Sequence, residues 1–303
     1  MTLRLGLDLG KRELKVVEGD GRRLKRHAET LLPDGALQDG VPTPLLTAAL
    51  RIVLEAGGFE AKAARVAISD TAVAVREFRL PALPRQELGG AVMFEGRRLV
   101  PMNAEDVYYA WHAQKDRAGY SVYLVAARRD MIDAVGAAVS AVGLELDRID
   151  LKPLALARGT GAPDGLILEW ETAEATLVLM VRGRPRFFRT FLLDAAPDDV
   201  DGQLEELALS VKALVKFVRS AEPEVPIGPT TPLYVGGRFA VVENGLQRAQ
   251  DGFEFAVRLP TPRFKSWTGF PWQTHLAGLG LLGRHSWRGR LTPSQGGDRR
   301  VPA

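Results

Sequence analysis

The chain has 303 residues, of which 46% are hydrophobic and none is cysteine. At roughly 100–200 residues per domain this length predicts about two domains, and the hydrophobic content is typical of a globular core. The lack of cysteine excludes disulfides, thiolate metal sites and a cysteine nucleophile. Lys and Arg number 40 against 37 Asp and Glu, an excess too small to indicate nucleic-acid binding, so we expect no direct nucleic-acid contact.

No segment resembles a signal peptide or a membrane span. Residues 1–10 alternate leucines with polar or small residues, which is the pattern of a strand rather than of a basic region before an apolar run. The longest apolar stretches fall far short of the ~20 residues that span a bilayer. We therefore expect a cytoplasmic protein without a transmembrane segment.

Residues 1–72 are expected to form the first part of one lobe. Alternating apolar residues predict strands near 3–9, 14–18, 24–32 and 65–69. A helix is expected from about Thr43 to Gly57-Gly58, where the glycines end it. The order combines hairpins with a crossover, which is typical of an α/β layer.

Residues 73–150 are expected to form an inserted subdomain. Helical spacing near residues 88–99 and 130–142 alternates with four strand-like segments, which gives the order β-α-β-β-α-β. A run of this kind can bury a small core of its own because its strands need a covering layer.

The remaining segments complete the first lobe and build a second. We assign residues 151–165 to the return into the first lobe, 166–270 to a shortened second lobe, 271–285 to a closing helix and 286–303 to a disordered basic tail. Strands expected near 166–169, 176–182 and 186–193 repeat the layout of the opening strands, which suggests two related halves. The tail holds four Arg and one Asp, which accounts for the whole charge excess.

A candidate site begins at Asp8-Leu9-Gly10-Lys11, where the first strand turns into the second. Gly10 would let backbone N–H groups approach an anion such as phosphate. An ordinary type I′ hairpin turn explains the same residues. The motif alone leaves both interpretations open.

Several segments in the same order resemble the type IV pilus assembly protein PilM, a relative of the division protein FtsA in the actin-like ATPase superfamily. These segments are Leu5-Gly6-Leu7-Asp8-Leu9-Gly10, Leu80-Pro81-Ala82-Leu83-Pro84, Val122-Tyr123-Leu124-Val125-Ala126-Ala127, Tyr234-Val235-Gly236-Gly237 and Leu279-Gly280-Leu281-Leu282-Gly283. The resemblance implies an α/β actin-like (ribonuclease H-like) two-domain fold with the inserted β-α-β-β-α-β subdomain and a reduced second lobe.

The resemblance also implies where a nucleotide would bind. The residues that correspond to the family's phosphate and adenosine positions are Asp8, Gly10, Lys11, Glu169, Gly236 and Gly237. The second phosphate turn departs from the family, because Glu171 replaces a glycine and Glu174 adds another carboxylate. These charges would repel a triphosphate, with Lys11 as a partial offset. We therefore expect a degenerate cleft, doubtful binding of ATP and Mg²⁺, no ATP hydrolysis, and neither catalytic residues nor a metal site.

By resemblance, the function would be that of a scaffold at the inner-membrane face in type IV pilus assembly, DNA uptake or type II secretion. It would bind the cytoplasmic amino-terminal peptide of a PilN-like inner-membrane protein, in a groove between the insertion and the first lobe, and contact other platform proteins. The sequence does not identify the groove residues. A nucleotide-dependent ATPase or switch and an FtsA-like division protein are the alternatives.

Other polar residues have weaker functional interpretations. Asp150 could act as a base toward a hydroxyl acceptor, but it also suits a strand end beside Lys152. The four histidines lack metal-ligand spacing. Arg182, Arg184 and Arg186 share one strand parity and could line a basic face, although a solvated sheet face explains them as well.

Overall fold

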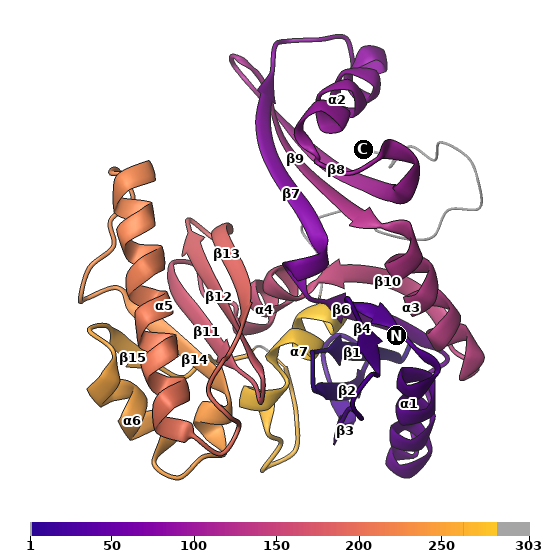
Figure 1. The fold of residues 1–303 in the computed structure, drawn as a ribbon, viewed down its shortest axis with the longest axis vertical. Coiled ribbons are helices and arrows are strands. Elements are labelled where there is room, and N and C mark those ends of the chain that lie inside the picture. The colour runs from indigo at the N-terminus through magenta and orange to yellow at the C-terminus, as the bar shows by residue number, and fades with distance from the viewer. Residues whose placement is uncertain (1, 263, 284–303) are drawn as a thin grey trace.

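A computed structural model describes residues 2–262 and 264–283 of the chain. Two lobes lie side by side, and a smaller unit stands above the first lobe in the view of Figure 1. The expected tail at 286–303 lies outside the described residues. Within the described ranges, no helix combines the length and the apolar character that crossing a membrane requires.

The first lobe is built on a five-stranded sheet with the order β10-β6-β1-β2-β3. Its strands are β1 (Arg4–Leu9), β2 (Glu13–Gly19), β3 (Leu24–Leu31), β6 (Ala63–Ile68) and β10 (Glu145–Leu151). β1 pairs antiparallel with β2 and parallel with β6. This order combines a meander with parallel crossovers, as the sequence predicted.

The second lobe repeats this topology strand for strand. Its sheet has the order β15-β14-β11-β12-β13 when read in the same direction, and β11 again pairs antiparallel with the next strand and parallel with its other neighbour. The strands are β11 (Gly165–Trp170), β12 (Glu174–Val181), β13 (Arg184–Leu192), β14 (Pro232–Gly237) and β15 (Ala256–Arg258). The two related halves suggested by the sequence are therefore present as a duplicated sheet.

The inserted segment contains all six expected elements in order, but they do not share one sheet. Three of them form an antiparallel sheet, β7 (Val73–Leu80), β8 (Val107–Asp116) and β9 (Gly119–Arg128), against which α2 (Arg85–Leu99) packs. The last strand, β10, instead pairs in parallel with β6. Its Ile149 and Leu151 are buried in the core of the first lobe together with residues of α3 (Arg129–Ala141). The domain limits expected from the sequence remain a prediction.

Helices cover both sheets through apolar stripes. In the first lobe, α1 (Pro44–Gly57) begins at Thr43, whose side chain accepts a hydrogen bond from the N–H of Leu45, and ends at Gly58 in the left-handed region. In the second lobe, α5 (Val200–Ala221) is capped by the Asp199 carboxylate. It buries Leu207, Val211, Val215 and Val218. The short β4 (Leu37–Gln38), β5 (Val41–Pro42) and α6 (Gly245–Gly252) and the edge strand β15 were not predicted.

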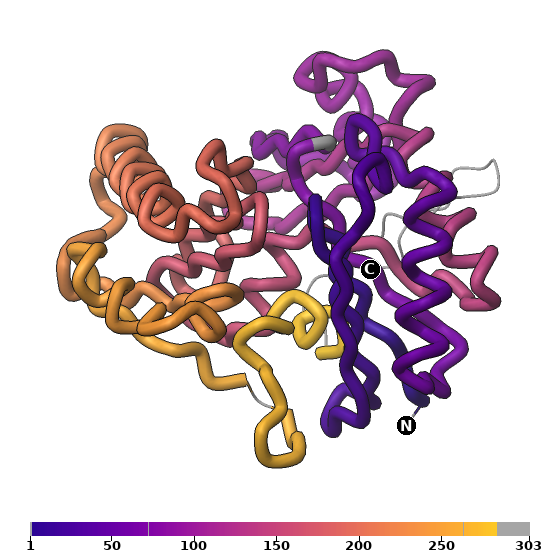
Figure 2. Tube along the Cα trace, turned by 60° about the horizontal axis from the view of Figure 1, so that its bottom comes forward, coloured from indigo at the N-terminus to yellow at the C-terminus, as the bar shows by residue number. Residues whose placement is uncertain are grey.

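Two helices that cross each other join the lobes. One of them, α7, is the yellow helix between the two lobes in Figure 2. These helices are α4 (Lys152–Thr160) and α7 (Leu276–Leu282). Their backbones touch because glycines face the contact. A Cβ atom on Gly159 would lie 1.9 Å from the carbonyl oxygen of Leu276, and one on Gly280 would lie 1.8 Å from that of Ala155. The crossing therefore excludes any side chain at either position.

Candidate functional site

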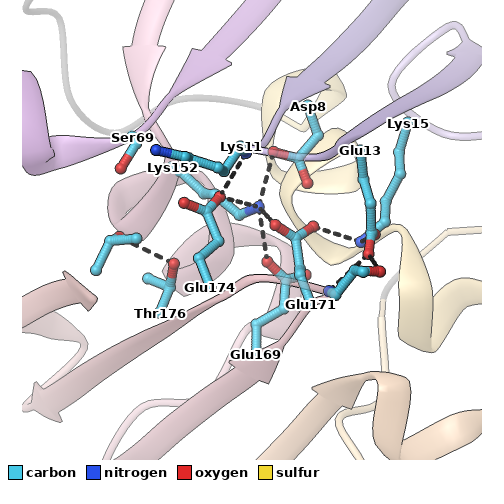
Figure 3. A network of polar contacts seen from close by, with 12 residues as sticks. Asp8, Lys11, Glu13, Lys15, Ser69, Lys152, Glu169, Glu171, Glu174 and Thr176 are labelled. Atoms are coloured by element: carbon cyan, nitrogen blue, oxygen red, sulfur yellow. Dashed lines mark hydrogen bonds and ion pairs between the residues drawn. The ribbon is translucent and has the colours of Figure 1, made fainter. Parts of the chain in front are cut away.

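The turns that follow β1 and β11 meet between the lobes (Figure 3). Asp8 lies near the end of β1 and is 1% exposed, and Glu169 lies at the corresponding place in β11 and is 0% exposed. One carboxylate oxygen from each of Asp8, Glu169 and Glu171 falls within 4.8 Å of the others. The structure thus brings together two of the expected site residues, from both lobes, in a buried position.

Lys152, at the start of α4, places its ammonium group among these carboxylates. Its Nζ lies 2.5 Å from Glu171 Oε2, 3.3 Å from Asp8 Oδ1 and 3.4 Å from Glu169 Oε2. Lys15 of β2 forms an ion pair with Glu171 and a second one, at 3.0 Å, with Glu13 Oε2. We call these seven residues the interlobe cluster: Asp8, Glu13, Lys15, Lys152, Glu169, Glu171 and Glu174.

Burial and the two lysines set the protonation of the cluster. Burial raises the pKa of Glu169 and of Glu174 to about 8 and also raises the pKa of Asp8, while Lys152 opposes each shift. Burial would likewise raise the pKa of Glu171, but Lys15 and Lys152 lower it to about 2. Glu171 is therefore an ionised carboxylate between two ammonium groups at neutral pH, whereas Glu169 and Glu174 are mainly protonated.

The two turns exchange hydrogen bonds across the cleft. Each turn is closed internally, by the N–H of Gly10 to the carbonyl of Glu13 at 3.0 Å and by the N–H of Glu171 to that of Glu174 at 2.9 Å. The next N–H of each turn donates to a carboxyl oxygen of the other turn. Lys11 donates to Glu174 Oε1 at 3.1 Å, and Thr172 donates to Glu13 Oε1 at 2.7 Å.

Carboxyl groups lie against the first turn, where the resemblance in the sequence would place a metal-bound triphosphate. A Cβ atom on Gly10 would lie only 2.7 Å from Glu171 Oε2 and 3.1 Å from Glu174 Oε1, so side chains fill the space above the first turn. The amides of Lys11 and Thr172, which would face a phosphate, already have acceptors. Lys152 occupies the centre of the carboxylate group, where a cation would lie.

Gly236 and Gly237, expected on the adenosine side, have a packing explanation. A Cβ atom on Gly236 would lie 2.5 Å from the side chain of Leu276 in α7. Gly237 has a φ of +70°, and a Cβ atom there would lie 2.1 Å from the carbonyl oxygen of Trp170 in β11. The close packing of β14 against its neighbours is therefore enough to explain both glycines, and no ligand is needed to account for them.

The sequence missed the cations of this site. Lys11 was expected to offset the carboxylates, but its side chain is exposed and its backbone N–H makes the recorded contact. Lys15 and Lys152 instead supply the ammonium groups. The sequence did contain a signal for a buried cation, which is a charged residue inside an apolar segment, such as Lys152 between Leu151 and Pro153.

The other polar candidates lie outside the cluster. Asp150 forms an ion pair with Arg158 in the next helix, consistent with a strand-end role. The rings of His27 and His275 meet edge to face, with their centroids 5.0 Å apart. Arg186 contacts Glu77 of the insertion at 2.8 Å and Glu222 at the end of α5, so this arginine joins two parts of the molecule.

A two-lobed fold made of one sheet topology repeated, with two crossing helices between the copies, defines the actin-like class. Among solved structures, the chain is similar to one described as the PilM-PilN type IV pilus biogenesis complex, with a TM-score of 0.75, 21% identity, and coverage of 92% of this chain and 97% of that one. It is also similar to the cytoplasmic domain of EpsL, an inner-membrane component of the type II secretion system of Vibrio cholerae, with a TM-score of 0.55, 13% identity and coverage of 94% and 97%. The ethanolamine utilization protein EutJ of Carboxydothermus hydrogenoformans gives a TM-score of 0.53, 13% identity and coverage of 93% and 89%. These likenesses confirm the expected fold.

The particular family follows from the sequence. The profile of the type IV pilus assembly protein PilM family matches residues 6–166, more than half of the chain. The chain belongs to this family, which confirms the resemblance found in the motifs. A search of curated protein sequences gives no match.

Proposed function

We propose that this member of the PilM family is a scaffold that binds the cytoplasmic amino-terminal segment of a PilN-like inner-membrane protein. The observation that carries the proposal is a groove between α1 of the first lobe and α3 of the inserted segment. Membership of a pilus assembly family supports the pathway, and the similar solved complex pairs a PilM with a PilN. Because a component of a type II secretion system has a similar fold, the proposal includes a role in a related secretion machine.

The groove has the chemistry of a site for an extended peptide. Its volume is about 480 Å³, and small side chains line it, so a peptide backbone can approach closely. The lining residues are Pro42, Thr43, Pro44, Thr47, Ala48, Arg51, Ala134, Ala137, Ala138 and Ala141. Arg51 bridges the two helices by donating to the carbonyl of Ala141 at 3.0 Å. Apolar peptide side chains in such a groove give affinity without any catalytic group.

We further propose that the cleft is degenerate and that peptide binding needs no nucleotide. The carboxyl groups of Glu171 and Glu174 over the first turn support this view, and we expect neither tight binding of ATP nor its hydrolysis. Attachment to the inner-membrane face would then come from the partner, and the scaffold would be a peripheral cytoplasmic protein.

A nucleotide-dependent switch is the second candidate. The close approach of oxygens from Asp8, Glu169 and Glu171 favours it, because hard divalent cations prefer such carboxylate sets. The two candidates differ in their response to Mg·ATP, which stabilises a protein only if it binds the native state.

Fluorescence anisotropy with a labelled peptide from the amino terminus of a PilN protein tests the scaffold. Ala137→Trp fills the groove, whereas Ser140→Trp alters an exposed residue of the same helix outside the groove. We expect Ala137→Trp to weaken binding by at least about tenfold, or about 1.4 kcal/mol, and Ser140→Trp to leave it unchanged. If the wild-type chain binds this peptide no better than a scrambled one, the proposed function is wrong.

A further inference from the structure

Three parts of the chain converge on the interlobe cluster: the turn of the first lobe, the turn of the second lobe, and the start of the connecting helix α4 (Figure 3). We infer that the cluster is a built-in substitute for a metal-bound phosphate, in which Lys152 replaces the cation and the carboxyl groups of Glu13 and Glu174 replace the phosphate oxygens. The lobes are thereby held closed without a ligand. This inference rests on the proposed nucleotide-free cleft.

The position of Lys152 supports the first half of the substitution. A cation that joined the lobes would need carboxylate oxygens from both, and the Lys152 ammonium has them in Asp8 of the first lobe and in Glu169 and Glu171 of the second. Its side chain is 0% exposed. An ammonium group provides three donors and one positive charge, so it can pair with several carboxylates at once.

The turn amides support the second half. Backbone N–H groups in tight turns after strands are the usual donors to a bound phosphate. Here Glu174 accepts from Lys11 and Glu13 accepts from Thr172, so each lobe supplies the acceptor for the turn of the other. A phosphate bound to both turns would make the same pair of contacts, and the side chains make them permanently.

The consequence is a closed resting state. Separating the lobes would break both interlobe hydrogen bonds and would pull Lys152 away from Asp8 or from Glu169 and Glu171. Nucleotide would then have no role in setting the angle between the lobes.

Thermal unfolding tests the substitution. In Lys152→Met the carboxylates lose their tethered cation, so we expect a lower melting temperature that millimolar Mn²⁺ or ammonium raises by several degrees relative to NaCl of equal ionic strength. The wild type should respond to neither, nor to Mg·ATP. Lys212→Met is the matched control, since Lys212 is 58% exposed and lies 3.7 Å from Glu254. It should also show no response.

The opposite results overturn the inference. A wild-type melting temperature that rises by several degrees with Mg·ATP or Mn²⁺ would show that the cleft accepts the ligand itself. A Lys152→Met chain as stable as the wild type and insensitive to cations would show that the ammonium has no such role. If that variant does not fold, the wild-type measurements decide alone. Peptide binding is measured separately, so failure of the scaffold function gives a different pattern.

Discussion

The backbone N–H of Lys11 donates a hydrogen bond to Oε1 of Glu174 across the interlobe cleft, at 3.1 Å. The equivalent bond of the other half runs from Thr172 to Glu13 at 2.7 Å. Both acceptors close their own turns through their backbone carbonyls. The two sheets share the same topology, so the turns after β1 and β11 are equivalent structures that face each other. The hydrogen bond from Lys11 therefore has an equivalent in the hydrogen bond from Thr172.

Removing one acceptor should weaken the interlobe contact. In Glu13→Ala the N–H of Thr172 loses its carboxyl partner, so we expect the free energy of unfolding to fall by about 1–3 kcal/mol. Glu13→Gln retains an acceptor oxygen and should lose less than half as much. Urea unfolding measures both variants. Equal losses would show that the charge of Glu13, and not its hydrogen bond, stabilises the native state.

The raised pKa values predict that stability decreases as the pH rises from about 5 to about 8. Glu169 and Glu174 have pKa values of about 8 in the native state and about 4.3 when unfolded. The native state therefore binds more protons in this window, and each group contributes stability that is lost as the pH rises through its native pKa, at roughly 1.4 kcal/mol per pH unit.

The variant Glu174→Gln should flatten that dependence. It removes one titrating group while it retains an acceptor for Lys11. Urea unfolding between pH 5 and pH 9 should show a smaller loss of stability with rising pH than the wild type shows. A wild-type stability that is constant or rises over this range would contradict the assigned protonation.

The crossing of α4 and α7 predicts intolerance of any side chain at Gly280. A Cβ atom there would overlap the backbone carbonyl of Ala155, so we expect Gly280→Ala to lower the free energy of unfolding by about 3 kcal/mol or more. Gly90→Ala is the control, because a Cβ atom at Gly90 in α2 would meet nothing within 4 Å. That change should stabilise the protein by up to about 1 kcal/mol. A neutral effect of Gly280→Ala would mean that the helices are farther apart than described.

Arg186 should restrain the insertion against the second lobe. It contacts Glu77 of β7 and Glu222, and its side chain is 42% exposed. Arg186→Met should therefore cost at most about 1 kcal/mol of overall stability, yet speed hydrogen exchange in β7. Arg79→Met, which breaks an exposed pair with Asp116 inside the insertion, is the control. Identical exchange in both variants would contradict the restraint.

Local patterns in the sequence predicted most strands and helices because burial alternates with their periods. The end of α1 was readable because glycine readily adopts the left-handed conformation that ends a helix. The pairing of β10 with β6 could not be predicted, because the residue pattern of a strand does not show which other strand it pairs with. The α6 helix buries only Gly245 and Ala249 and so has no apolar stripe to detect.

The candidate site was predicted in part. The positions of Asp8 and Glu169 at strand ends indicated that their carboxyl groups belong to the site. Glu171 and Glu174 do lie between the lobes. Lys15 sits between the buried residues Leu14 and Val16, and strand alternation would place its side chain toward solvent. It is buried because the strand end points into the cleft, and only the meeting of two distant turns determines that environment.

The most direct measurement of the central claim is the affinity of the wild-type chain for the PilN amino-terminal peptide, with and without Mg·ATP. Because the interlobe cluster already occupies the cleft, we predict the same dissociation constant in both conditions. An affinity that rises tenfold or more when Mg·ATP is added, equivalent to about 1.4 kcal/mol of coupling between the sites, would contradict the account.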